Sequence, residues 1–271
     1  MRNLKVLALL LAPVMFAACG DNDSDFASRP SGDSSSSGKS NSSVALATPC
    51  KTETEDNCEY GELVDDRDGQ TYKTVVIGKQ TWMAENLNYA YTGVPYKNED
   101  YKSDSTSWCY KNDTSNCTKY GRLYTWAAAM DSVGEWSTNG KGCGYRTECS
   151  PTYPVRGICP EGWHLPTKTE IETLLAVVGG QLTACKMLKS TDGWFDSGNG
   201  TDAFGFSALP AGRERDALFF YDEGEQAYFW SSTGNSSGGA IPMTAYYADD
   251  VLYSSTGAFK YFGYSVRCLK D

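Results

Sequence analysis

Cysteine is the residue type whose number and spacing say most about chemistry in this chain, since ten occur among 271 residues. A count this high is typical of an oxidising compartment, where thiols pair as disulfides. Three pairs each bracket a short polar loop, and we expect each to form a local disulfide: Cys50 with Cys58, Cys109 with Cys117, and Cys143 with Cys149.

Two further cysteines lie far apart, and a bridge between them would close a long loop. Cys159 precedes a predicted helix and Cys268 lies in the last predicted strand. The chain-entropy model assigns a loop of about a hundred residues up to roughly 4.7 kcal/mol. Cys185 is then left over, either as a buried thiol or as a site of intermolecular pairing. Zinc is the competing use of these thiols, but the chain has no Cys-x-x-Cys and one histidine, so we expect no metal site.

Nucleophilic catalysis would depend on a single histidine, His164. It lies in an aromatic, proline-flanked segment, and the sequence singles out no nucleophile or carboxylate as its partner. We therefore expect His164 to have a structural role.

Acidic residues gather in two places. Asp65, Asp66 and Asp68 resemble the start of a calcium loop, but Ile77 stands where an EF-hand beginning at Asp66 has its bidentate Glu, so we expect a hairpin turn. A second group would suit a glycosidase only at the right carboxyl separation, and solvated loops explain it equally: Asp222, Glu223, Glu225, Asp249 and Asp250. The sequence therefore predicts no enzyme, no catalytic residue and no cofactor.

Aromatic residues are numerous, with seven tryptophans and eighteen tyrosines. Their flat faces bind sugar rings, and tyrosine is favoured at protein interfaces. We expect four tryptophans to pack in the core: Trp82, Trp126, Trp163 and Trp230. A second group lies beside glycines and charges, mostly in a predicted loop over 213–225, and we expect it to bind a ligand. Its members are Trp194, Arg213, Arg215, Tyr221 and Tyr247.

The charge balance excludes one class of partner. Lys and Arg number 24 and Asp and Glu 34, so the formal net charge is −10. Nothing in such a chain would release phosphate counterions, and we expect no nucleic-acid partner.

The first residues have the pattern of a bacterial export signal. Arg2 and Lys5 precede an apolar run over 6–18, which is too short for a bilayer span and suits a signal-peptide core. Small residues end the run directly before Cys19, as in a lipobox, where the cysteine is lipidated and becomes the first mature residue. We expect residues 1–18 to be a lipoprotein signal peptide; an ordinary signal peptide is the alternative.

A flexible tether and one folded domain are expected after the signal. Residues 19–48 are dominated by Ser, Asp, Asn and Gly and bury too little apolar surface to fold. In the domain, over 49–271, a capping-box pattern from Thr167 to Glu170 predicts one principal helix ended by two glycines. A shorter helical piece is expected over 124–130.

Strand patterns separated by turn signals fill the rest of the domain. Residues 72–77 and 80–83 are expected to form a hairpin. Further strands are predicted over 204–209, 226–232, 243–248 and 264–269.

Several blocks, in order, span nearly all of residues 60–271. They are Asp66–Val75, Trp82–Leu87, Tyr120–Trp126, Gly157–Pro166, Phe204–Gly212, Phe229–Ser232 and Gly263–Cys268. The chain thereby resembles the Fibrobacter succinogenes major paralogous (FISUMP) domain, a family of exported bacterial proteins. The resemblance implies no established activity.

The same resemblance implies an α+β, C-type-lectin-like fold with antiparallel strands, stabilised by disulfides. Calcium-dependent lectins of that fold carry Glu-Pro-Asn or Gln-Pro-Asp and a later Trp-Asn-Asp, none of which occurs here. The formylglycine-generating enzyme shares a segment like Trp163–Thr167 but needs a reactive cysteine pair near its C-terminal end, and only Cys268 lies beyond Cys185. The segment favours the fold and not the catalysis.

Together these observations predict a surface-exposed lipoprotein of the bacterial cell envelope, held in the outer membrane by its lipid. Its domain is expected to bind polysaccharide or another surface protein without catalysis. A structural envelope protein without a discrete ligand is the alternative. A carbohydrate-active or formylglycine-generating-like enzyme comes third.

Overall fold

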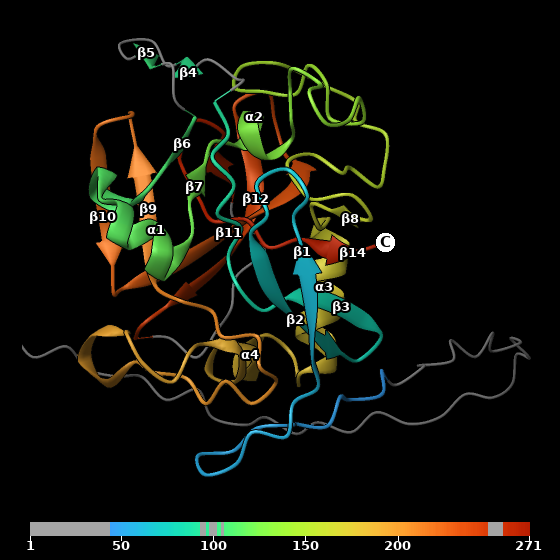
Figure 1. Ribbon diagram of the computed structural model, residues 1–271, viewed down its shortest axis with the longest axis vertical. Coiled ribbons are helices and arrows are strands. Elements are labelled where there is room, and N and C mark those ends of the chain that lie inside the picture. Colours follow the sequence, from blue (N-terminus) through green and yellow to red (C-terminus); the bar gives the residue numbers. More distant parts are fainter. Residues whose placement is uncertain (1–43, 93–95, 98–101, 104–105, 249–256) are drawn as a thin grey trace, which may run out of the picture. The chain divides into compact units, whose positions relative to one another are not determined.

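Antiparallel strands and short helices are mixed in the computed structural model (Figure 1). By its contacts, the chain from Ser43 to Asp271 forms one unit. Cys19 and the predicted signal peptide lie outside the residues that the structure describes. The described residues are 44–92, 96–97, 102–103, 106–248 and 257–271.

A five-stranded sheet joins the beginning of the domain to its end. Its order is β1-β2-β3-β14-β8, with the bounds Tyr60–Val64, Thr71–Ile77, Gln80–Met83, Leu269–Lys270 and Trp163–His164. The predicted hairpin is confirmed as β2–β3, in which Val75 pairs with Trp82. The expected turn before β2 is also confirmed, because the Asp65 carbonyl accepts a hydrogen bond from Gly69 N at 2.7 Å.

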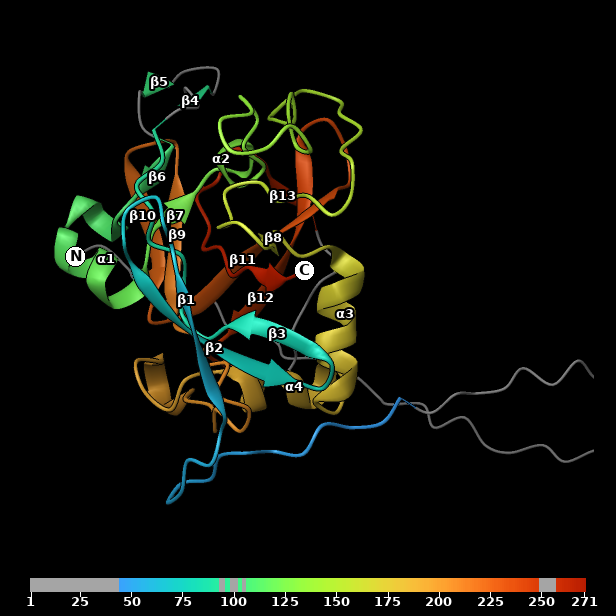
Figure 2. The same cartoon turned by 45° about the vertical axis from the view of Figure 1, so that its right-hand side comes forward.

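The described helices are α1 (Thr114–Tyr120), α2 (Trp126–Ala129), α3 (Lys168–Val177) and α4 (Gln181–Leu188), with 3-10 turns η1 (Tyr110–Asn112) and η2 (Phe195–Ser197). The predicted principal helix is α3, which begins with a complete capping box between Thr167 and Glu170. It packs beside β3, where Gln80 Nε2 donates to Glu170 O at 3.0 Å (Figure 2). The expected shorter piece is α2, whereas α1 and α4 were not predicted.

The later strands form a hairpin and a three-stranded sheet. β9 (Ala211–Arg215) pairs with β10 (Phe219–Glu223), so the prediction of a loop over 213–225 is wrong. The sheet has the order β11-β12-β13, over Gln226–Gly234, Gly239–Tyr246 and Ala258–Phe259. Two short pairs complete the strands: β4 (Tyr96–Lys97) with β5 (Lys102–Ser103), and β6 (Ser107–Trp108) with β7 (Leu123–Tyr124).

Two of the expected late strands are replaced by irregular chain. Residues 204–209 form a turn followed by irregular chain with an isolated bridge at Ala208, and the carbonyls of Phe206 and Ser207 accept hydrogen bonds from the buried guanidinium of Arg267. Residues 264–268 pair only through isolated bridges, and the strand β14 begins at Leu269. In both segments the backbone groups bond to partners distant in sequence, which periodicity does not reveal.

Four disulfides hold these elements together, and they are the four expected pairs. Cys185 is in none of them and is buried in α4, with its Sγ 3.9 Å from Tyr246 O. The four tryptophans expected in the core are at most 6% exposed.

Within the described part of the chain, no single helix has the length and apolar character to cross a membrane. Only α3 and α4 taken together reach that length, and they are bent by 85° at the break between them.

Candidate functional site

The β9–β10 hairpin brings three of the predicted binding residues to one face. Side chains alternate along β9, so Arg213 and Arg215 point to the face opposite Glu214. Tyr221 is the cross-strand partner of Arg213, and Phe219 is the partner of Arg215. Tyr221 is 40% exposed, so its ring is open to a ligand.

Arg213 lies among aromatic rings in a cleft of about 310 Å³. Its guanidinium carbon is 5.3 Å from the centre of the Phe262 ring, 5.6 Å from Tyr228 and 5.9 Å from Tyr221. Beyond the rings, the polar lining includes Gln226 and Thr244 of the β11–β12 sheet. We call this site the aromatic–arginine cleft.

An ion pair fixes the cation in this cleft. Arg213 Nε is 2.9 Å from Asp222 Oδ2, and the Tyr228 hydroxyl also lies 2.9 Å from that oxygen. Burial opposes the charge of the guanidinium, but the neighbouring acidic groups, with Asp222 in the ion pair, outweigh it and raise the pKa of Arg213. Burial also raises the pKa of Tyr228, which keeps its hydroxyl neutral. The cleft therefore combines ring faces, a permanent cation and neutral hydroxyls, which suits a ligand with apolar faces and many hydroxyl groups.

Arg215 lies near Phe262, one of the rings of the cleft, with its guanidinium carbon 6.0 Å from that ring and its Nε 3.1 Å from Asp216 Oδ2. The other two predicted residues form a separate cluster. Tyr247 packs against Phe195, with ring centres 5.6 Å apart. Trp194 is only 6% exposed and its indole N–H donates to Ser190 Oγ at 3.0 Å. Trp194 therefore offers no ring face to a ligand, contrary to expectation.

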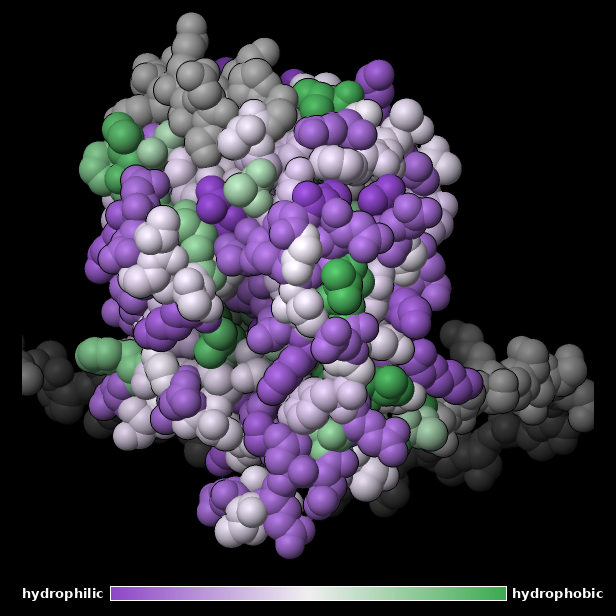
Figure 3. Space-filling model, viewed as in Figure 1, coloured by the Kyte–Doolittle hydropathy of each residue, from purple (hydrophilic) through white to green (hydrophobic). Residues whose placement is uncertain are grey.

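A larger polar cleft of about 560 Å³ lies between α1, β2 and residues 202–209, and the sequence did not indicate it. Figure 3 looks onto this largely hydrophilic face. Charges of both signs line the cleft, and Lys51 Nζ is 2.8 Å from Asp202 Oδ2. Because the lining comes from segments as far apart as Lys51 and Leu209, no local spacing in the sequence could have predicted it. The charged members are Lys51, Asp56, Lys73, Glu85, Lys119 and Asp202.

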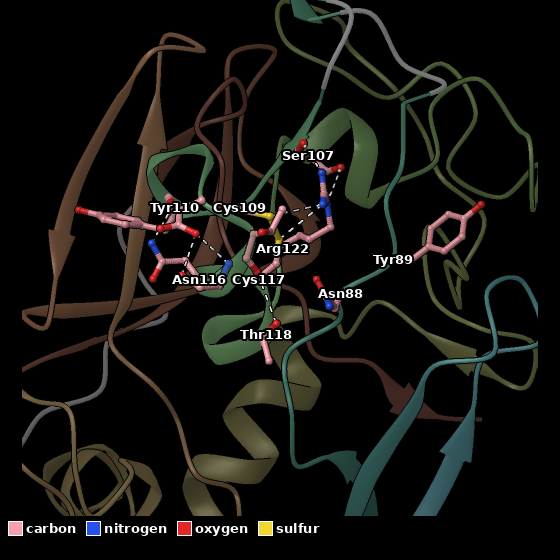
Figure 4. Close-up of a disulfide and its surroundings, with 12 residues drawn as sticks. Asn88, Tyr89, Ser107, Cys109, Tyr110, Asn116, Cys117, Thr118 and Arg122 are labelled. Carbon is pink, nitrogen blue, oxygen red and sulfur yellow. Dashed lines mark hydrogen bonds between the residues drawn. A yellow bond between two sulfur atoms is a disulfide. The ribbon is translucent and has the colours of Figure 1, made fainter.

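The Cys109–Cys117 disulfide braces one wall of the polar cleft (Figure 4). Arg122 lies against both sulfurs, at 3.6 and 3.5 Å, and donates to Ser107 O at 3.0 Å. Gly121 ends α1 with φ near 70°, and a Cβ there would lie 2.8 Å from Leu87 O. The glycine therefore permits the end of α1 to lie close to the backbone at Leu87.

His164 is engaged on both ring nitrogens. Its Nδ1 lies 2.7 Å from Asp271 Oδ1 and its Nε2 lies 3.1 Å from Glu170 Oε1. Burial opposes the imidazolium, but these two carboxylates outweigh it and raise the pKa of His164. The same contact holds the pKa of Glu170 near 2 against the effect of burial. This geometry ties β8, α3 and the chain after β14 together.

Two of the carboxylates considered for catalysis lie beside basic side chains. Asp222 is bound to Arg213, and Glu223 Oε2 lies 3.3 Å from Lys111 Nζ. Asp249 and Asp250 lie outside the described residues. Over the ranges that are described, no three His, Cys, Asp or Glu side chains gather as a metal site requires.

Comparison with known proteins gives one match. The family model described as the Fibrobacter succinogenes major domain matches residues 75–270. No curated protein and no solved structure matches the chain.

Proposed function

The chain belongs to the Fibrobacter succinogenes major domain family, and on that premise we propose that it is a lipid-anchored protein of the bacterial cell envelope that binds polysaccharide without catalysis. We assign the binding to the aromatic–arginine cleft, in a domain of the C-type-lectin-like fold.

The observation that carries this proposal is the position of Arg213 among the rings of Phe262, Tyr228 and Tyr221. Sugar rings have apolar faces that pack on aromatic side chains, and hydroxyl groups that accept hydrogen bonds from a guanidinium fork. A fixed cation beside an exposed ring therefore suits a sugar better than it suits a purely apolar ligand.

The arrangement of the elements supports the lectin-like fold. A capped helix, α3, follows Cys159, and antiparallel strands lead from it to Cys268. The strands that carry the cleft lie between these two cysteines, so a disulfide-closed scaffold holds the binding face.

Two observations support a binding role over catalysis. His164 is held between two carboxylates, and Asp222 is occupied by Arg213. The contacts of His164 hold the chain together, and the contact of Asp222 holds Arg213 in the cleft.

Glycan-array and polysaccharide pull-down measurements on the full chain test the proposal. Because Arg213 lines the cleft and the exposed Tyr221 is its cross-strand neighbour, we expect Tyr221→Ala and Arg213→Met each to weaken glycan binding about tenfold. Phe195→Ala, at an exposed aromatic outside the cleft, is the matched control and should leave binding unchanged.

Three results would contradict the proposal in different ways. Glycan binding that survives both cleft changes would move the site elsewhere. Capture of a surface protein with no glycan bound would favour the protein-binding alternative. Absence of any ligand would favour a structural envelope role.

A further inference from the structure

Lys260 is a buried lysine with no acidic partner in the described part of the chain. It follows β13 and is 2% exposed. Its backbone is held on both sides, since its N–H donates to Gly238 O and its carbonyl accepts from Trp126 N, each at 3.0 Å. Its Nζ lies 4.3 Å from the centre of the Trp126 ring and 3.4 Å from Thr147 O.

A buried ammonium group normally pairs with a carboxylate, because taking it out of water costs free energy. Here burial lowers the pKa of Lys260, and among the described residues no neighbouring charge offsets that effect. The ring of Trp126 and one carbonyl group are weak compensation for a full positive charge. Among the described residues, the ammonium therefore has no carboxylate at ion-pair distance, and an anionic ligand would supply that countercharge.

Lys260 lines a cleft of about 430 Å³, which we call the lysine pocket, and the exposed residue Glu148 lines it as well. A Cβ at Gly234 would lie 3.8 Å from Lys260 Nζ and 3.7 Å from the Trp126 ring, so the glycine leaves the space before the ammonium open. Tyr153, 50% exposed, offers a ring face at the rim. The hydroxyl groups of Ser236 and Ser237 also line the pocket.

We propose that the lysine pocket binds the carboxylate of a uronic acid unit in an acidic polysaccharide. The ammonium supplies the countercharge, the Tyr153 ring supplies an apolar face, and the serine hydroxyls meet those of the sugar. A bare anion would use only the ammonium, and an apolar ligand would use only the Tyr153 ring.

The lysine pocket is separate from the aromatic–arginine cleft. The pocket is built at the end of β11, around Gly234, whereas the cleft uses Gln226 at the beginning of that strand. The inference rests on the proposed function only in taking the ligand to be a glycan.

The test compares an oligogalacturonate with the same oligosaccharide after its carboxyl groups are reduced to alcohols, by calorimetric titration of the full chain. We expect the acidic form to bind about tenfold more tightly, and Lys260→Met to abolish that preference. Gly234→Gln should weaken the acidic form as well, because its side chain fills the space before an intact Lys260. Lys270→Met, at an exposed lysine, is the matched control.

A second readout avoids variants that fail to fold. In the unmodified chain, the acidic oligosaccharide should slow acetylation of the Lys260 amine by an amine-reactive reagent, and the reduced form should not. Acetate at the same carboxylate concentration should protect the amine less.

Each other outcome overturns a stated part of the proposal. Equal binding of both oligosaccharides, or a preference that survives Lys260→Met, removes the uronate assignment and leaves the aromatic–arginine cleft standing. Equal protection by acetate reduces the pocket to a simple anion site. Absence of binding by either oligosaccharide contradicts the inference, and loss of every other glycan as well contradicts the proposed function.

Discussion

Glu214 lies on the buried face of β9, where neither carboxylate oxygen has a hydrogen-bond partner among the described residues. Burial raises the pKa of this carboxyl group to about 8, from an ordinary value of 4.5. The folded chain therefore keeps a proton that the unfolded chain releases at a lower pH. By linkage, the stability associated with Glu214 is fully present below pH 4.5 and is lost as the pH rises to about 8.

We expect Glu214→Gln to remove this loss, because a neutral amide mimics the protonated acid. The free energy of unfolding of the wild type should fall by up to about 1.4 kcal/mol per pH unit over that window relative to the variant. Thermal unfolding from pH 4 to 9 measures the difference, with Glu62→Gln on exposed β1 as control. Identical pH profiles for wild type and Glu214→Gln would contradict the buried-acid assignment.

Arg267 shows at the same scale why a charged residue is retained in the core. It is 1% exposed, and its guanidinium donates to Asn86 Oδ1 at 2.8 Å and Ser207 O at 2.7 Å. Burial lowers its pKa to about 9. Its guanidinium also bonds the Phe206 carbonyl, so the carbonyls of two consecutive residues outside any strand have a buried donor.

At the scale of elements, α3 depends on its first turn. Thr167 Oγ1 accepts a hydrogen bond from Glu170 N at 3.2 Å, and Glu170 Oε2 accepts one from Thr167 N at 2.8 Å. We expect Thr167→Ala to lower the free energy of unfolding by about 1 kcal/mol, because it leaves a helix N–H without its acceptor.

Urea unfolding of Thr167→Ala checks this, and Thr169→Ala makes the same chemical change at an exposed position in the same turn. Equal midpoints for the two variants would show that the cap contributes nothing. Because Glu170 also contacts His164, a larger loss in Thr167→Ala would indicate that the cap positions that contact too.

At the scale of the whole molecule, the Cys159–Cys268 disulfide closes 109 residues, whereas Cys143–Cys149 closes 6. The chain-entropy model values such loops at about 4.7 and about 2 kcal/mol. We expect removal of both long-range cysteines by Ala to lower the melting temperature more than removal of the short pair. Non-reducing peptide mapping should recover the long bridge, and equal losses for the two double variants would contradict the entropic account.

The anchor also belongs to this scale, because it decides where the domain acts. If Cys19 is acylated, Cys19→Ser should release the chain from the membrane fraction or stop its processing. Mass spectrometry of the mature N-terminus and fractionation of cells measure both. Recovery of wild-type chain in the soluble fraction with an unmodified Cys19 would contradict the lipid anchor.

The features that the sequence determined by itself are those set within a few residues or by pattern. The turn at Asp65, the cap at Thr167 and the three short disulfides depend on neighbouring groups, so spacing alone predicted them. Family membership is also a property of the sequence, because the ordered blocks that carry it are runs of consecutive residues.

Tertiary structure decided the rest. Whether Trp194 is buried and where Lys260 lies depend on contacts between segments that are not neighbours in the sequence. Trp126 and Lys260 are in contact although 134 positions separate them in the sequence, and local composition does not predict such a contact. Burial and charge pairing are properties of the packed chain, which is why both clefts and the lysine pocket became visible only in the fold.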